Sequence, residues 1–205
     1  MTHSVFMRIA FIGQKGIPCR VGGVERHVDE LAQELVALGQ QVFVYTRPHY
    51  TFAKLTDHAG VRLISLPSIR TKHLDAISHT LFASFHALRQ HYDIIHYQGV
   101  GPSLLSFIPR IFLRRTKIVC TIHCLDKFHA KWGKLAQWFL SLGEWAACRW
   151  PHATIVVSPL LASYCQSRFG KKTTCIPNGV RVEECQNKVA LAPEFILTCA
   201  RLMPQ

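Results

Sequence analysis

The chain has 205 residues, of which 49% are hydrophobic and 18% charged, a composition typical of one globular domain, or of one domain and the start of another. Its 24 lysines and arginines exceed its 12 aspartates and glutamates, so the net charge of +12 favours phosphate, nucleic acid or anionic lipid as a partner. The sequence has no signal-peptide core and no run of eighteen apolar residues, which predicts a cytoplasmic protein without a membrane-spanning helix. Its eight cysteines include no C-x-x-C pair, so we expect free thiols.

Short apolar runs alternate with helical patterns along the whole chain. Strands are predicted at residues 6–12, 41–46, 61–67, 93–97, 117–122, 153–158, 173–180 and 194–200. Helices are predicted at residues 23–39, 74–90, 101–115, 130–150 and 159–169. Pro109 should kink or interrupt the third of these helices. The second helix has its large apolar residues on one face, at Leu74, Ile77, Leu81, Phe85 and Leu88.

This alternation predicts an α/β fold in which helices cover both faces of a Rossmann-like parallel sheet. Ligands bind such sheets beyond the carboxyl ends of the strands, so the candidate sites are loops 13–22, 46–52, 98–101, 123–129 and 177–180. We interpret the aperiodic stretch 180–193 as the end of a first domain, residues 1–193. Residues 194–205 would then be the first strand of a second domain.

The loop after the first predicted strand is rich in glycine and reads GQKGIPCRVGG. It ends at a helix N-terminus, where free amide groups and the helix dipole favour an anion, so Gly22 and Gly23 are candidate phosphate contacts. The glycine spacing matches neither a dinucleotide fingerprint nor a P-loop, and the second strand ends in YTRPH without a carboxylate for a ribose. A loop with glycine turns and no ligand is the alternative.

Several motifs in this order resemble those of one enzyme family. The stretch GIPCRVGGVERHVDELAQEL resembles the first loop and helix of retaining GT-B glycosyltransferases of family four, in the subgroup with an I-P-x-R-x-G-G loop. TIHCLD at 121–126 is similar to the T-x-H-G-x-D segment, and ATIVVSPLLASY at 153–164 to the strand and helix before the hinge. CIPNGV at 175–180 and ILTCARLMPQ at 196–205 resemble the I-P-N-G-V turn and the opening of the second domain.

The resemblance implies the N-terminal, acceptor-side half of a GT-B fold and assigns roles to individual residues. It places Gly22 and Gly23 near the diphosphate of a nucleotide-sugar donor and His123 near the donor sugar. It gives Arg201 a diphosphate contact and Arg20 a contact to the acceptor or a phosphate.

Two further residues complete the expected site. We expect Asp126 to fix the loop that carries the histidine, and Gly99 to line the acceptor site. His79 and His96 are interpreted as ordinary packed or solvated residues. A zinc site at Cys120, Cys124 and His129 is disfavoured, because no second pair of ligands has finger spacing.

The sequence departs from the family pattern in three ways. Cys124 and Ala200 replace glycines, and the chain ends at Gln205, before the family's lysine and its paired glutamates. We therefore expect an isolated chain of 205 residues to lack turnover.

The resemblance implies a reaction and its co-substrates. It implies transfer of a sugar, with retention, from a nucleotide-diphosphate sugar to a glycan or polyprenyl-linked acceptor, in the synthesis of a surface polysaccharide. The nucleotide-sugar is a co-substrate, and no metal or other cofactor is obligatory. The alternative is a truncated, non-catalytic remnant or binding module with the same fold.

A basic stretch extends from Phe107 to Trp150 and contains eight lysines and arginines against two acidic residues. It also contains four tryptophans, and such a mixture suits the surface of an anionic membrane. We expect the aromatic residues to be mostly core and the basic ones to face anionic lipid, which would place the protein at the inner face of the membrane. No nucleic-acid-binding signature is present, so nucleic acid is not an expected partner.

Overall fold

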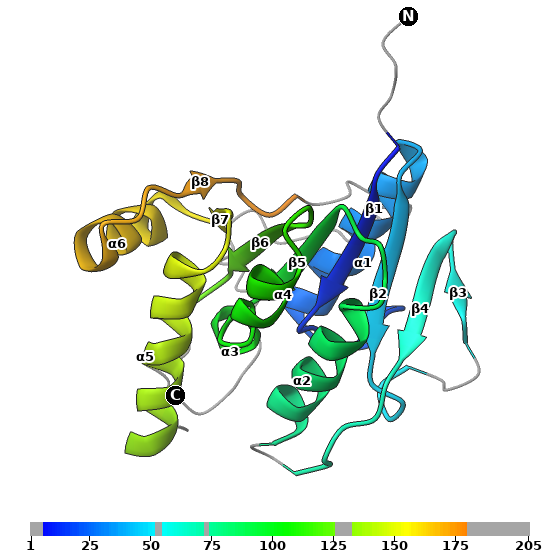
Figure 1. The fold of residues 1–205 in the computed structure, drawn as a ribbon, viewed down its shortest axis with the longest axis horizontal. Coiled ribbons are helices and arrows are strands. Elements are labelled where there is room, and N and C mark those ends of the chain that lie inside the picture. The colour runs from blue at the N-terminus through cyan, green and yellow to red at the C-terminus, as the bar shows by residue number, and fades with distance from the viewer. Residues whose placement is uncertain (1–5, 52–54, 72–73, 126–132, 180–205) are drawn as a thin grey trace, which may run out of the picture.

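The computed structural model describes residues 6–51, 55–71, 74–125 and 133–179, which form one sheet with helices on both faces (Figure 1). The sheet has eight strands in the order β3-β4-β2-β1-β5-β6-β7-β8. The strands are β1 (Arg8–Ile12), β2 (Gln41–Thr46), β3 (Asp57–His58), β4 (Val61–Ser65), β5 (Ile94–Gln98), β6 (Lys117–Ile122), β7 (Ala153–Val156) and β8 (Thr174–Cys175). The helices are α1 (Gly23–Ala37), α2 (Asp75–Ala87), α3 (Val100–Ser103), α4 (Phe107–Phe112), α5 (Lys134–Arg149) and α6 (Pro159–Phe169).

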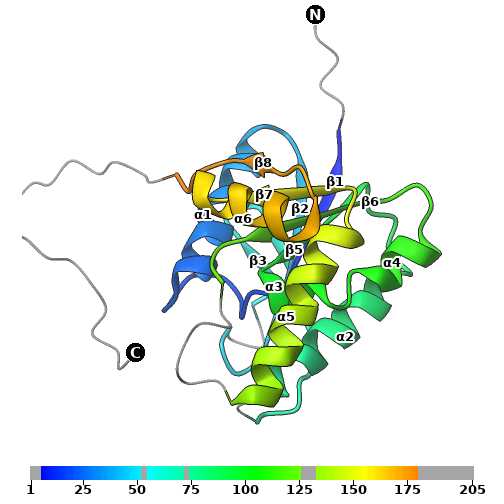
Figure 2. The ribbon, with the colours of Figure 1, turned by 90° about the vertical axis from the view of Figure 1, so that its left-hand side faces the viewer.

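All neighbouring strands are parallel except β3, which pairs antiparallel with β4. The central strand β1 sends alternate side chains to the two faces. Ile9 and Phe11 pack with Val28 of α1, whereas Ala10 and Ile12 pack with Ala83 of α2. Figure 2 shows α1 on one side of the sheet and α2 with α4 on the other. The predicted α/β fold with a covered parallel sheet is therefore confirmed.

Most elements lie where the periodicity predicts them. The bounds of β2, β6 and α6 equal the predicted ones. Helix α6 has strong local signals: the Ser158 hydroxyl accepts a hydrogen bond from the Leu161 amide, Pro159 occupies the first turn, and Gly170 ends the helix with a φ of 65°. The predicted strand 194–200 and the domain boundary at 180–193 lie outside the described residues.

Two predictions about secondary structure need correction. The single helix at 101–115 is two helices, α3 and α4, and the break at 104–106 precedes Pro109. Pro109 is the third residue of α4, a position where the missing amide costs no intrahelical hydrogen bond. The two-residue strand β3 was not predicted, because a segment this short has no measurable periodicity.

The face of α2 that contacts the sheet is the opposite of the one its apolar pattern predicts. Leu81, Phe82 and Phe85 are 36%, 43% and 50% exposed. The residues that α2 buries are small or polar: Ser78, His79, Thr80, Ala83, Ser84 and Ala87.

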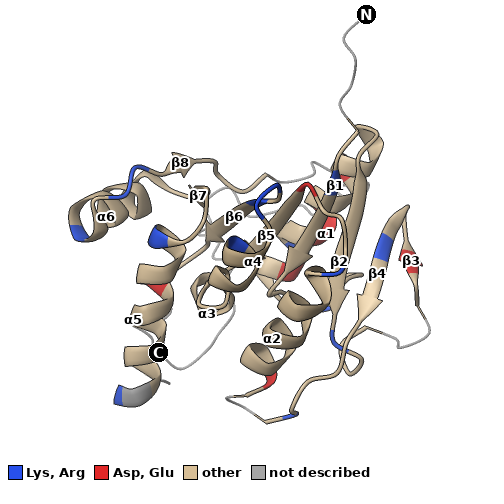
Figure 3. Cartoon of the chain, in the orientation of Figure 1, with Lys and Arg blue, Asp and Glu red and all other residues tan. Residues whose placement is uncertain are grey.

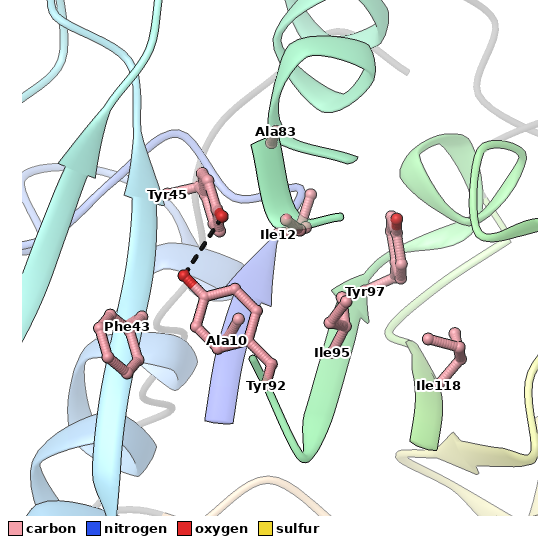
Figure 4. Packing of buried hydrophobic residues seen from close by; sticks show 10 residues of the cluster. Ala10, Ile12, Phe43, Tyr45, Ala83, Tyr92, Ile95, Tyr97 and Ile118 are labelled. Atoms are coloured by element: carbon pink, nitrogen blue, oxygen red, sulfur yellow. Dashed lines mark hydrogen bonds between the residues drawn. The ribbon is translucent and has the colours of Figure 1, made fainter. Parts of the chain in front are cut away.

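Large tyrosines in the sheet and just before β5 explain this inverted packing. Tyr45, Tyr92 and Tyr97 fill the space beneath α2, as Figure 4 shows, and small helix residues are needed opposite them. The tyrosine hydroxyls are satisfied within the core: that of Tyr45 lies 3.3 Å from the Tyr92 hydroxyl, and that of Tyr97 lies 2.7 Å from the Ser84 hydroxyl. Polar residues on α2 therefore pair with the hydroxyls that the sheet buries.

The aromatic residues of α5 also differ from the expectation that they are mostly core. Trp138, Phe139 and Trp145 are 56%, 49% and 43% exposed, whereas Ala146 and Ala147 are fully buried. The contact between α5 and its neighbours is close because its buried residues are small: Gly143 leaves no room for a side chain against the Val100 backbone of α3. None of the described helices is long and apolar enough to cross a membrane.

The inverted face of α2 can be tested with two adjacent substitutions. Ser84→Leu should lower the free energy of unfolding by about 2 kcal/mol, because it overpacks the core and removes the hydrogen bond to Tyr97. Phe85→Ser should change it by less than about 0.5 kcal/mol, because this side chain is half exposed. Urea denaturation of both variants measures the difference, and a larger loss from Phe85→Ser would contradict the packing described.

Candidate active site

The loop 13–22 connects β1 to α1 at the carboxyl edge of the sheet, and two carboxylates of α1 hold it in place. The Lys15 amide donates a hydrogen bond to Glu25 Oε1 over 3.1 Å, and the Cys19 amide donates one to Asp29 Oδ2 over 2.7 Å. Both acidic side chains are buried and lie on the side of α1 that faces the loop. The helix therefore positions the loop that precedes it.

The second half of the loop is held from the segment after β2. The Tyr50 hydroxyl accepts hydrogen bonds from the amides of Arg20 and Val21, each over 2.9 Å, and lies 2.9 Å from the Val21 carbonyl oxygen. The Thr51 hydroxyl donates to the Ile17 carbonyl oxygen over 3.0 Å. Arg20 thus sits on an exposed part of the loop whose backbone is fixed.

The two glycines at the start of α1 differ in whether the fold itself requires a glycine. Gly22 has a φ of 118°, and a Cβ atom there would collide with the Glu25 carboxylate. Gly23, the first residue of α1, has no other atom within 4 Å of the place where a Cβ would lie. The fold therefore explains Gly22 but gives no steric reason for Gly23. The free amides of this first turn make it a suitable anion site.

His123 follows β6 and is held by the end of the neighbouring strand β5. Its Nε2 lies 2.9 Å from Gln98 Oε1. An amide oxygen only accepts, so the imidazole Nε2 carries the proton and Nδ1 can accept a hydrogen bond. The His27 ring of α1 meets the His123 ring edge to face, with 5.0 Å between centroids. Three segments, the ends of β5 and β6 and the first turns of α1, therefore converge at this point.

Burial keeps these imidazoles neutral. Removal from water, together with the nearby His27, lowers the pKa of His123 to about 4. Burial also lowers the pKa of His27. At neutral pH this edge of the sheet therefore offers uncharged hydrogen-bonding groups beside the N-terminus of α1.

Gly99 lies at the same edge, directly after Gln98. It has a φ of 91°, its amide donates to the Thr121 carbonyl oxygen over 2.8 Å, and it precedes α3. The structure thus brings Gly99, His123 and the start of α1 to one edge, while Arg20 lies on the Tyr50 side of the loop. Asp126 and Arg201 lie outside the described residues.

Sequence reasoning missed three residues that shape this edge: Glu25, His27 and Gln98. Gln98 could have been found, because it is a polar residue at the end of a buried strand and just before a glycine. Glu25 and His27 lie within the first turns of α1, but only the folded loop shows that they face inward.

His79 and His96, interpreted from the sequence as packed or solvated residues, are both buried. His79 is fully buried, its Nε2 lies 3.1 Å from the Thr46 carbonyl oxygen, and burial lowers its pKa to about 4. His96 Nε2 lies 2.7 Å from the Thr121 hydroxyl, and burial lowers its pKa to about 3. Cys120, considered for zinc, is fully buried with its Sγ 2.6 Å from the Ser103 hydroxyl.

The glycine pair generates a prediction about stability. Gly22→Ala should lower the free energy of unfolding by roughly 1–3 kcal/mol, because the backbone is strained at positive φ and Glu25 is displaced from Lys15. Gly23→Ala should change it by less than about 0.5 kcal/mol, since the site is open. Chemical denaturation of the two variants provides the comparison. Equal losses would mean that Gly23 serves the fold and would remove the argument for a ligand.

The buried histidines generate a prediction about pH. His79, His96 and His123 have folded-state pKa values of about 4, 3 and 4, below the ordinary value near 6.5. Between these values the unfolded chain binds more protons, so the free energy of unfolding should fall as pH drops from 6.5 to 4. Urea denaturation at a series of pH values measures the slope. His79→Gln should reduce this slope, and an unchanged slope in that variant would contradict the assignment.

The comparisons with known proteins show the family and the fold of the chain. Residues 21–184 match the model of Glycosyltransferase Family 4. No curated protein matches the chain. A solved sucrose-phosphate synthase from Thermosynechococcus elongatus is 20% identical, with a TM-score of 0.64 over 83% of this chain and 48% of that one. Anabaena HepE, solved in complex with UDP and glucose, is 19% identical, with a TM-score of 0.59 over 85% of this chain and 45% of that one.

A shorter piece of the same synthase is 20% identical, with a TM-score of 0.54 over 84% of this chain and 89% of that piece. At this level of identity the solved structures establish the fold alone, and the chain spans about half the length of the first two. The family match covers most of the chain, from the end of the glycine loop to beyond β8. The chain therefore belongs to Glycosyltransferase Family 4.

Proposed function

We propose that the chain is the acceptor-side part of an enzyme that transfers a sugar, with retention, from a nucleotide-diphosphate sugar to a glycan or polyprenyl-linked glycan in surface polysaccharide synthesis. The observation that carries this proposal is the neutral His123, held by Gln98 beside the open first turn of α1. The family match supports it. HepE, solved with UDP and glucose, supports a nucleotide-sugar as the donor.

The first turn of α1 suits the leaving diphosphate. Charge develops on this group as the bond to the sugar breaks, and fixed amide dipoles stabilise such charge without reorganising. The open space at Gly23 allows an oxygen atom to approach the backbone closely. In this proposal Arg201 adds a second contact to the diphosphate, and no metal or other cofactor takes part.

His123 suits the sugar. With Nε2 donating to Gln98, its Nδ1 accepts a hydrogen bond from a sugar hydroxyl. The low pKa keeps the ring neutral, so it orients the sugar without adding a cation beside a developing oxocarbenium ion. Asp126 fixes the loop after β6, and Arg20 and Gly99 line the acceptor side. With retention, the donor phosphate accepts the proton of the acceptor hydroxyl.

A binding module without turnover is the second candidate. It would use the same described edge, with the open first turn of α1 at Gly23 and His123 held by Gln98. Both candidates predict that the described edge binds a nucleotide-sugar, but only the first predicts a reaction when the remaining half of the site is supplied. We expect the 205-residue chain alone to bind the donor weakly and to lack turnover.

Ligand-detected NMR with UDP-glucose tests the proposed site. We expect weak binding by the wild-type chain and at least a fivefold loss in affinity for Gly23→Ala, because the added methyl group occupies the space of the diphosphate. Gly133→Ala is the matched control, since Gly133 also has open space but precedes α5. Equal affinity for all three proteins would contradict the site. The anomeric configuration of any product formed, compared with that of the donor, tests retention.

A further inference from the structure

Helices α2 and α4 pack beside each other and expose a group of large apolar side chains, which we call the outer patch. Its members are Leu81, Phe82 and Phe85 of α2 with Ile111 and Phe112 of α4. Ile111 and Phe112 are 60% and 67% exposed, which is more than any of the three α2 residues. Scattered apolar residues are normal on a protein surface, but neighbouring ones on two helices indicate an interaction site.

Aromatic contacts extend the outer patch to α5. The Trp150 ring lies 6.2 Å from Phe107 of α4 and meets the exposed Trp145 edge to face at 5.4 Å. The Arg149 guanidinium lies 5.8 Å from the centre of the Trp150 ring. Tryptophan and arginine side by side are typical of proteins at the boundary between lipid headgroups and acyl chains.

Basic residues border the outer patch. Helices α2, α4 and α5 all end at the amino-terminal edge of the sheet, because each leads into the next parallel strand. Their last turns and the segments that follow therefore bring several exposed cations together, as Figure 3 shows for α4 and α5. These residues are Arg89, Arg110, Arg114, Arg115, Lys117 and Arg149.

The acidic residues of the same segments do not offset this charge. Among the described residues from 74 to 150, the acidic ones are Asp75, Asp93 and Glu144. Asp75 forms an ion pair with Arg47 at 2.6 Å, and Glu144 is 1% exposed and accepts a hydrogen bond from the Tyr164 hydroxyl. Asp93 accepts the Arg8 amide over 2.7 Å. The exposed charge around the outer patch is therefore almost entirely positive.

We propose that the outer patch docks on an anionic lipid bilayer, with its aromatic residues among the headgroups and the bordering arginines on lipid phosphates. Apolar insertion and cationic attraction act together at such a surface, and each is weak alone. The site differs from the basic stretch 107–150 singled out in the sequence, because α2 contributes three of the five residues of the outer patch. If the proposed function holds, the same surface would keep the enzyme beside a lipid-linked acceptor.

Co-sedimentation of the 205-residue chain with vesicles tests this inference. At low ionic strength we expect binding to vesicles of phosphatidylglycerol and phosphatidylcholine, and at least tenfold weaker binding to phosphatidylcholine alone. Phe82→Ser combined with Phe85→Ser should reduce the partition coefficient severalfold, and Arg114→Glu combined with Arg115→Glu should reduce it about tenfold or more. All four side chains are exposed, so the variants should remain folded.

Two control variants separate a specific surface from general attraction. Leu38→Ser with Ile176→Ser removes exposed apolar residues elsewhere, and Arg26→Glu with Arg62→Glu makes the same change in charge on other elements. We expect both to bind vesicles like the wild type. Equal losses of vesicle binding in control and patch variants would overturn the proposal, because binding would then depend on the net charge of the chain alone.

If the chain self-associates and does not bind vesicles, the outer patch is a protein interface and the proposal is overturned. Sedimentation velocity would detect this self-association. Donor binding by the patch variants should stay normal. The two proposals can therefore fail separately.

Discussion

The attachment of loop 13–22 to α1 is the constraint on which the candidate site depends. Glu25 and Asp29 accept amides of the loop that comes before their own helix, so loop and helix form one rigid unit. This attachment leaves the first turn of α1 open at Gly23 and directs His27 toward His123. Without these carboxylates the loop would not be held against α1. The ends of β5 and β6 would then have no ordered anion site beside them.

A second constraint acts on the opposite face of the sheet, beneath α2. Here the large buried residues do not come from the helix, and the helix buries small residues. The side chains of Tyr45, Tyr92 and Tyr97 fill the space beneath α2. The helix therefore contributes serine, threonine and alanine to the contact. Its leucine and phenylalanine residues must then point outward. The core of this face thereby determines the exposed apolar surface, and stability and the proposed lipid contact have one structural origin.

The sequence predicted the parallel sheet and most of its strands and helices, because apolar runs and glycine stops are local signals. It also predicted the edge of the sheet at which the candidate site lies. It also predicted His123 and the glycine pair as site residues, and the structure brings them to one edge. It could not predict the buried face of α2, because that face depends on tyrosines of other segments. Tyr45 precedes α2 in the chain, and Tyr92 and Tyr97 follow it. Gln98 and His27 were missed for the same reason: their roles depend on partners from other elements.

The central claim is that the first turn of α1 and His123 together face the diphosphate and sugar of a nucleotide-sugar. A titration of the ¹⁵N-labelled chain with UDP-glucose, followed by amide and imidazole chemical shifts, tests it most directly. The account predicts shifts at the amides of Gly22, Gly23 and Val24 and at the ring of His123, with the opposite edge of the sheet unaffected. Shifts confined to other elements, or none at saturating ligand, would contradict it.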